Sequence, residues 1–156
     1  MSGESDPRMH SAEHVLNATM VRLIASPRAF SAHLDGPKGK VDYRFGRDLS
    51  EAELASVQEA VNGAVAAGYP VNETFLSRAE AAARFDLSRL PEGSGEKLRI
   101  VSIGDYDACP CSGRHVANSS EIGGFRIIGH EHKDGILRLR FRLDPPAGRA
   151  PESDAT

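Results

Sequence analysis

Two pairs of residues with metal-binding side chains stand out in the sequence. His10 and His14 are four residues apart, so on a helix their side chains share one face. Cys111 and His115 have the same spacing and offer a thiolate sulfur and an imidazole nitrogen. Three nitrogens with one sulfur form a set that zinc binds tetrahedrally. The four residues therefore predict a zinc (Zn2+) site, and the alternative is a solvated histidine pair and a loop cysteine without metal.

Glu13 lies inside the histidine pair and completes the pattern His-x-x-Glu-His. An inverted zinc-protease motif has this form and uses its glutamate as a general base. Such proteases need a further carboxylate ligand and a large chamber, whereas this short chain offers cysteine and histidine. Glu13 is therefore kept as a candidate catalytic residue, with an exposed helix carboxylate as the plainer interpretation.

The histidine pair is expected on a helix that begins near Arg8. Apolar residues recur there at helical spacing and form one stripe: Met9, Ala12, Leu16, Met20 and Leu23. Ser26-Pro27 ends this helix, because the residue before a proline resists helical geometry. His10 and His14 lie well away from the stripe, so we expect them to face solvent, a neighbouring element or a metal rather than the main core.

Two further helices are marked by capping boxes, in which a serine and a glutamate three residues later satisfy free backbone N–H groups. The first is expected to open at Ser50 and end at Gly68, because glycine suits the left-handed conformation of a helix C-terminus. The second is expected to open at Ser77 and to end near Phe85.

The remaining regular elements are expected to be strands. Two pairs form hairpins, one around the Gly/Pro-rich turn 35–39 and one around the Asp-Gly turn 134–135. The strands of the two hairpins are expected at 28–34 and 40–45 and at 125–132 and 136–143. Two further strands are expected at 70–75 and 98–103. Residues 104–123 are expected to form mostly a functional loop. Because helices and strands do not alternate regularly, we expect an α+β fold, with an antiparallel sheet, packed helices and the metal site between a helix and a loop.

Length and composition fit one globular domain. The chain of 156 residues is expected to form a domain over 8–143 between loose tails at 1–7 and 144–156.

The net charge of -3 gives no support for nucleic-acid binding, which must depend on a local basic patch. The longest apolar runs are too short to span a membrane. Cys109 and Cys111 are too close for a structural disulfide, which favours a reducing, cytoplasmic setting.

The metal-binding motifs resemble those of the alanyl-tRNA synthetase editing domain and of the free-standing AlaX-type trans-editing proteins. That family pairs a His-x3-His helix with a later Cys-x3-His loop. The first motif is matched by HSAEHVLNA (10–18). The second, usually Cys-Gly-Gly-Thr-His-Val followed by a turn and a strand, is matched by CSGRHVANSSEIGGFRI (111–127). The segment GKVDYRFGRDLSEAELASVQEAVNGAV (39–65) resembles the strand and helix of the family that lie between them.

The resemblance implies a fold of the threonyl/alanyl-tRNA synthetase editing-domain type, with His10, His14, Cys111 and His115 as zinc ligands. It implies hydrolysis of the ester that joins a wrong amino acid to the 3′ end of tRNA. Seryl- or glycyl-tRNA carrying an alanine anticodon is the expected substrate. The chain has no room for an aminoacylation domain, so it is expected to act in trans. His10, His14 and Glu13 are then the candidate catalytic residues.

Substrate-binding residues are expected next to the ligands and on one strand. The resemblance places Ser11 and Arg114 beside the ligands, and Arg114 stands where the family has threonine. The side chain of Arg114 could face a phosphate or change which amino acid fits. Arg138 and Arg140 alternate with leucines, so they share one strand face and could contact the tRNA backbone. The alternative is the ordinary polar face of an antiparallel strand.

Zinc is expected mainly to position the substrate or a water molecule, since an aminoacyl ester is already activated. Four protein ligands would close the site, so turnover needs one ligand to loosen or the coordination number to rise. Two other functions stay open. One is a non-catalytic module of the same fold that binds zinc or an amino acid, and the other is a zinc hydrolase of another ester or peptide.

The other histidines and the other cysteine are expected to have no part in the metal site. His130 and His132 share one strand face and are expected to be satisfied surface or half-buried residues. Cys109 is expected to be a bystander beside the ligands.

Overall fold

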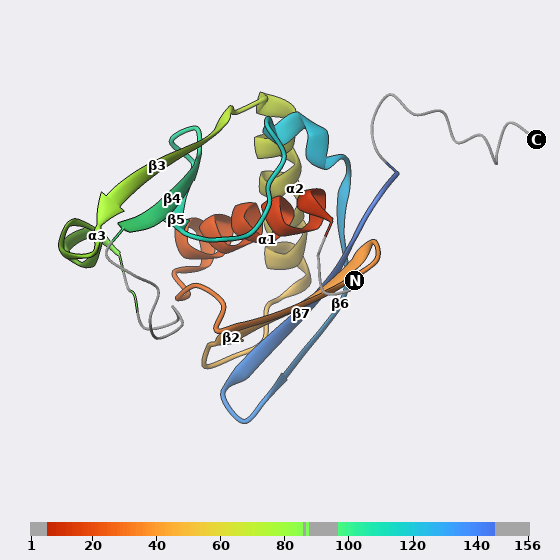
Figure 1. Cartoon of the computed structure of the whole chain (residues 1–156). Helices are drawn as coiled ribbons and strands as arrows, with labels where there is room; N and C mark the ends of the chain where they lie inside the picture. The colour runs from red at the N-terminus through yellow and green to blue at the C-terminus, as the bar shows by residue number, and fades with distance from the viewer. Residues whose placement is uncertain (1–5, 86, 88–96, 146–156) are drawn as a thin grey trace, which may run out of the picture.

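The computed structural model describes residues 6–85, 87 and 97–145. They form an α+β domain in which three α-helices pack with two antiparallel sheets (Figure 1). Most of the two expected tails lies outside these residues. Among the described residues, no helix is long and apolar enough to cross a membrane.

The larger sheet has four strands in the order β1-β2-β7-β6. Its strands are β1 (Ser31–Asp35), β2 (Lys38–Arg44), β6 (Phe125–Lys133) and β7 (Ile136–Leu143), and all neighbours are antiparallel. Both predicted hairpins are confirmed. At the second turn Asp134 and Gly135 have φ of 54° and 78°, the left-handed pair that the Asp-Gly sequence favours. One face of this sheet supplies much of the core: Val41, Tyr43, Phe125, Leu137, Leu139, Phe141 and Leu143.

The smaller sheet has three strands in the order β3-β4-β5. They are β3 (Val71–Ser77), β4 (Lys97–Ile103) and β5 (Asp107–Pro110). The expectation that 104–123 is mostly loop is therefore wrong at its start, where β5 pairs with β4, and at Ser119–Ile122, which forms a 3-10 turn (η2). The four residues of β5 have no alternating apolar pattern, so backbone pairing with β4 decides their conformation.

The helix that carries the histidine pair is α1 (Pro7–Thr19), and a π-helical turn (η1, Met20–Ile24) extends it. α1 contacts β1 and β2 of the larger sheet and β5 of the smaller one, and Figure 1 shows it running between them. Every residue from Ser11 to Met20 is consequently buried. The predicted apolar stripe holds as far as Met20, but Leu23 is 52% exposed.

The other two helices start as their capping boxes predict. α2 (Glu51–Ala67) is capped by Ser50 and ends at Gly68, which has φ of 71°. α3 (Arg78–Arg84) is capped by Ser77. The apolar face of α2 joins the core that α1 shares with the larger sheet, through Val57, Val61, Ala64 and Val65.

Candidate metal centre

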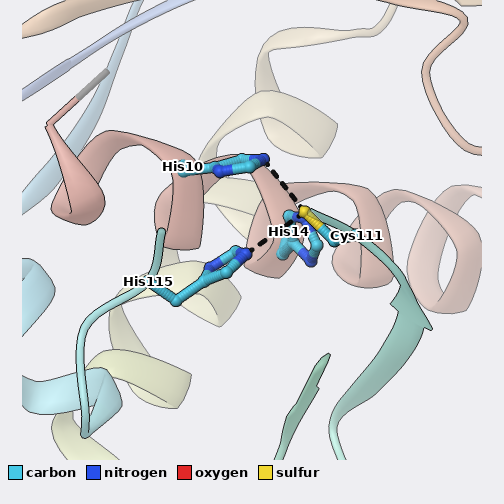
Figure 2. A group of neighbouring side chains, drawn as sticks. All are labelled: His10, His14, Cys111 and His115. Atoms are coloured by element: carbon cyan, nitrogen blue, oxygen red, sulfur yellow. Dashed lines mark hydrogen bonds between the residues drawn. The ribbon is translucent and has the colours of Figure 1, made fainter. Parts of the chain in front are cut away.

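The structure brings the four predicted ligands together. His10 and His14 come from α1, and Cys111 and His115 come from the segment that follows β5 (Figure 2). One ligand atom of each residue lies within 4.8 Å of the others. The sulfur of Cys111 is 3.4 Å from Nε2 of His10 and 3.4 Å from Nε2 of His115. The group is therefore compact enough to hold a metal ion.

The chemistry of this group fits zinc. Three imidazole nitrogens and one sulfur are borderline-soft donors of the kind found in structural and catalytic zinc sites. Burial raises the pKa of the Cys111 thiol, but hydrogen bonds from His10, His115 and His14 outweigh it and lower the pKa to about 3. The sulfur is thus a thiolate at neutral pH, which is the form that binds metals.

Ser11 fixes the orientation of one ligand ring. Its Oγ is 3.0 Å from Nδ1 of His115 and accepts a hydrogen bond of 3.1 Å from the backbone N–H of Val116. With Nδ1 engaged by Ser11, Nε2 of His115 is left facing Cys111. Ser11, which was expected at the substrate, is itself buried beneath this ring.

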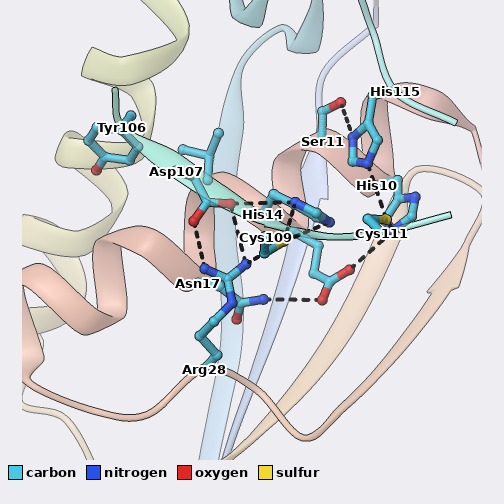
Figure 3. Close-up of polar contacts among 12 residues, drawn as sticks. His10, Ser11, His14, Asn17, Arg28, Tyr106, Asp107, Cys109, Cys111 and His115 are labelled. Atoms are coloured by element: carbon cyan, nitrogen blue, oxygen red, sulfur yellow. Dashed lines mark hydrogen bonds and ion pairs between the residues drawn. The ribbon is translucent and has the colours of Figure 1, made fainter. Parts of the chain in front are cut away.

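His14 is held by partners that the sequence did not reveal. As expected, His14 faces a neighbouring element and the cluster rather than the apolar core, but it is only 4% exposed because α1 lies between two layers. Its Nδ1 lies 3.4 Å from Oδ2 of Asp107 and 3.3 Å from Sγ of Cys109, both on β5 (Figure 3). Burial lowers the pKa of His14, but the contacts with Asp107 and Cys109 outweigh it and raise the pKa. Cys109, expected to be a bystander, is thus in contact with a candidate ligand.

Two further features position the loop that carries Cys111 and His115, one facing α1 and one on β4. A Cβ on Gly113 would lie 2.0 Å from Cε1 of His10, so only glycine fits against this ring. Nη1 of Arg99 donates to the carbonyl oxygens of Cys111 and Gly113 at 3.1 and 2.6 Å. Sequence patterns gave no sign of Arg99, because its contacts depend on how β4 meets the loop.

Glu13 lies next to the cluster. The interpretation of this residue as an exposed helix carboxylate is wrong, since it is 7% exposed. Its Oε1 lies 3.9 Å from Nε2 of His10, and its Oε2 accepts a hydrogen bond of 3.2 Å from Nδ2 of Asn17. The cluster therefore has a carboxylate oxygen beside it, on a side chain that Asn17 holds in place.

The predicted basic residues do not all meet at the cluster. Arg114 is exposed in the loop next to His115. Arg138 and Arg140 alternate along β7 with buried leucines, so they lie on the face of the larger sheet that is turned away from α1. Arg138 forms a bidentate pair with Asp42, and Arg140 pairs with Glu131.

The histidine pair of β6 behaves as expected. Nδ1 of His130 is 2.9 Å from a carboxylate oxygen of Asp48, and Nε2 of His132 is 2.7 Å from the carbonyl oxygen of Phe45. Both rings thus have partners in the segment that follows β2.

Comparison with known proteins identifies relatives of this chain. Residues 98–140 match the pattern of the Threonyl and Alanyl tRNA synthetase second additional domain. The chain is 30% identical to the alanine–tRNA ligase of Methanococcus maripaludis over 86% of its own length and to that of Methanopyrus kandleri over the same share. It spans only 16% and 15% of the lengths of these relatives. The resemblance drawn from the motifs is confirmed: part of the chain matches the Threonyl and Alanyl tRNA synthetase second additional domain, and most of it is similar to a segment of alanine–tRNA ligases.

Proposed function

We propose that this protein hydrolyses mischarged aminoacyl-tRNA with the help of zinc held by His10, His14, Cys111 and His115. The bond that breaks is the ester between the amino acid and the 3′ end of tRNA. Seryl- and glycyl-tRNA with an alanine anticodon are the first substrates to test, and the cytoplasm is the expected setting. The observation that carries the proposal is the convergence of these four side chains in a relative of alanine–tRNA ligases.

Zinc bound there would act as a Lewis acid toward the ester carbonyl or would lower the pKa of a bound water. The residues of the chain supply the rest of the site. His10 and His14 project from one helix and hold one side, while the loop from Cys111 to His115 holds the other. A cytoplasmic setting suits this ligand set, because both cysteines are free thiols in the structure and thiols stay reduced there.

Glu13 is the residue best placed to handle a proton or a positive charge. Its Oε1 lies beside His10, and Asn17 fixes the other oxygen, so the free oxygen has a defined direction. In the proposed reaction it accepts a proton from the attacking water or pairs with the ammonium group of the aminoacyl ester. An aminoacyl ester carries such an ammonium next to the bond that breaks, which gives this carboxylate a partner in the substrate.

The tRNA itself is proposed to be held by arginines. Arg114 is exposed in the loop between Cys111 and His115, and its proposed partners are the terminal phosphates of the tRNA. Arg138 and Arg140 lie on the far face of the larger sheet, where a contact could be made only with a more distant part of the tRNA. Charge reversal at Arg138 and Arg140 should weaken tRNA binding and flatten its salt dependence. Unchanged binding would leave these residues as the ordinary polar face of a strand.

Deacylation assays on purified protein test the proposal. Seryl-, glycyl- and alanyl-tRNA are incubated with the protein, with and without a chelator, and the released amino acid is measured. Chelator-sensitive release of one amino acid supports the proposal. Zinc or aminoacyl-tRNA binding without release would favour a non-catalytic module, which the closed set of four ligands would suit. Inertness toward all three tRNAs would leave a zinc hydrolase of another ester or peptide.

Paired variants connect activity to the cluster. Cys111→Ala together with His14→Ala should remove zinc and abolish deacylation. His130→Ala is the matched control, because it removes a histidine of the larger sheet that contacts Asp48 and lies outside the cluster. Retained deacylation in the double variant, with circular dichroism showing a folded protein, would refute the metal-dependent mechanism.

A further inference from the structure

His14 belongs to two overlapping groups that could hold a metal ion. One is the cluster with His10, Cys111 and His115, and the other joins His14 to Asp107 and Cys109. A single imidazole can point a given nitrogen into only one of them. Nδ1 of His14 is the atom that faces the second group, at 3.4 Å from Asp107 and 3.3 Å from Cys109.

A positively charged side chain already lies against the second group. Nη1 of Arg28 lies 2.6 Å from Oδ1 of Asp107, and Nη2 lies 3.3 Å from Oδ2 of the same carboxylate. Nη2 also lies 3.4 Å from the sulfur of Cys109. An arginine is always charged, so a divalent ion placed here would be repelled by the guanidinium and would have to displace it. The second group is therefore a poor place for a metal ion.

We propose that Asp107, held by Arg28, is a positioning residue for His14 and that Cys109 is not a metal ligand. This inference rests on the zinc site of the proposed function. The Asp107 carboxylate accepts the Nδ1–H of His14, which fixes the ring and leaves the lone pair of Nε2 directed at the cluster. Histidine ligands in zinc proteins commonly donate their second N–H to a carboxylate in this way.

Burial makes this contact effective. The side chains of Asp107 and His14 are 4% and 5% exposed, so water cannot replace either partner. The bidentate pair with Arg28 fixes the carboxylate, and β5 fixes its backbone through pairing with Ile103. The same strand leads directly into Cys111, so β5 positions one ligand through its backbone and another through Asp107.

Zinc affinity of the purified protein tests this role. The isosteric variant Asp107→Asn should bind zinc about 10- to 100-fold more weakly than the wild type, measured by competition with a chromophoric chelator. Asp42→Asn is the matched control, since it breaks another bidentate Arg–Asp pair, on the larger sheet away from the cluster. Cys109→Ser should leave the thiolate-to-metal charge-transfer band of the cobalt-substituted protein in place, because Cys111 supplies that band.

The outcomes separate this inference from the function on which it rests. Wild-type protein that binds no zinc would overturn the metal site itself. Wild-type protein that binds zinc, with an unchanged affinity in Asp107→Asn, would overturn the role of Asp107 alone. A weaker or absent charge-transfer band in Cys109→Ser than in the wild type would show that Cys109 is a ligand.

A measurement on the wild type avoids any folding defect of the variants. Nitrogen-15 NMR of the imidazole groups in the zinc-loaded protein should show His14 protonated at Nδ1 and bound to metal through Nε2. The opposite arrangement, with metal on Nδ1, would overturn the inference.

Discussion

Replacing Gly113 by alanine should weaken zinc binding by displacing a ligand. The backbone of Gly113 is not in the left-handed region, so alanine can adopt its conformation and the effect comes from contact alone. The added Cβ would lie 2.0 Å from Cε1 and 2.2 Å from Nδ1 of His10. Carbon atoms in contact prefer separations of about 3.5–4.0 Å, so the ring has to move by roughly 1.5 Å.

That displacement sets the size of the effect. Metal–ligand distances in well-formed sites hold to about 0.2 Å, so zinc could be bound through His10 only if the ring were forced back against the new methyl group. Overpacking by one methyl group costs about 1–3 kcal/mol. In the metal-free protein the ring can swing away, since the side chain of His10 is 22% exposed. The cost therefore falls mainly on the zinc-bound state and corresponds to a loss of about 5- to 150-fold in affinity.

Zinc competition titrations and thermal melts with and without zinc measure this effect. Gly63→Ala is the control, because Gly63 is exposed on α2 and a Cβ there would meet nothing within 4 Å. That change should stabilise the fold by about 0.5–1 kcal/mol, as alanine is the better helix former, and leave zinc affinity unaltered. Wild-type zinc affinity in Gly113→Ala would refute the assignment of His10 as a ligand held in this position.

Three further predictions concern residues outside the ligand set. Arg99→Met removes the donors that bind the carbonyl oxygens of Cys111 and Gly113. Zinc affinity should therefore fall about tenfold, and hydrogen exchange of the backbone amides in 111–115 should become faster. Unchanged amide exchange would contradict the role of Arg99. Tyr43→Phe should raise the free energy of unfolding, measured in urea, by about 1 kcal/mol, because the buried hydroxyl of Tyr43 has no hydrogen-bond partner among the described residues. A free energy of unfolding below that of the wild type would show that the hydroxyl has a partner. Hydrogen bonds from Arg138 lower the pKa of Asp42 in the folded protein, so its stabilising effect is fully present above the unfolded-state pKa of about 3.9 and is lost as the pH falls through the lowered folded-state pKa. Asp42→Asn should consequently reduce the drop in melting temperature between neutral pH and acid, and an equal drop would contradict this.

Local signals in the sequence predicted most of the elements. The capping boxes at Ser50 and Ser77 and the Asp-Gly turn at 134–135 each satisfy backbone groups within a few residues, so no distant partner is needed to specify them. β5 was not predicted, because the conformation of its four residues depends on backbone pairing with β4.

The surroundings of α1 show where periodicity fails. A single apolar stripe predicts one buried face, but a helix between two layers is buried on several faces. His14 and Glu13 therefore lie inside the protein, although they are off the stripe. Spacing predicted the four residues of the cluster because each pair is local to one segment. Asp107 and Arg99 could not be predicted, because they reach the site only through the tertiary packing of the smaller sheet.

The order of strands in the larger sheet has a consequence for how the protein folds. β2 pairs with β7, so segments about one hundred residues apart in the chain must meet before that sheet is complete. The smaller sheet, from β3 to β5, uses one continuous stretch of chain and can form by more local pairing. Closing the loop between β2 and β7 is the slower event, because a non-local pairing loses more chain entropy before any stabilising contact forms. Cys111 and His10 are separated by a similarly long stretch of chain, so zinc capture should also be a late step of refolding, following the collapse of the core rather than nucleating it.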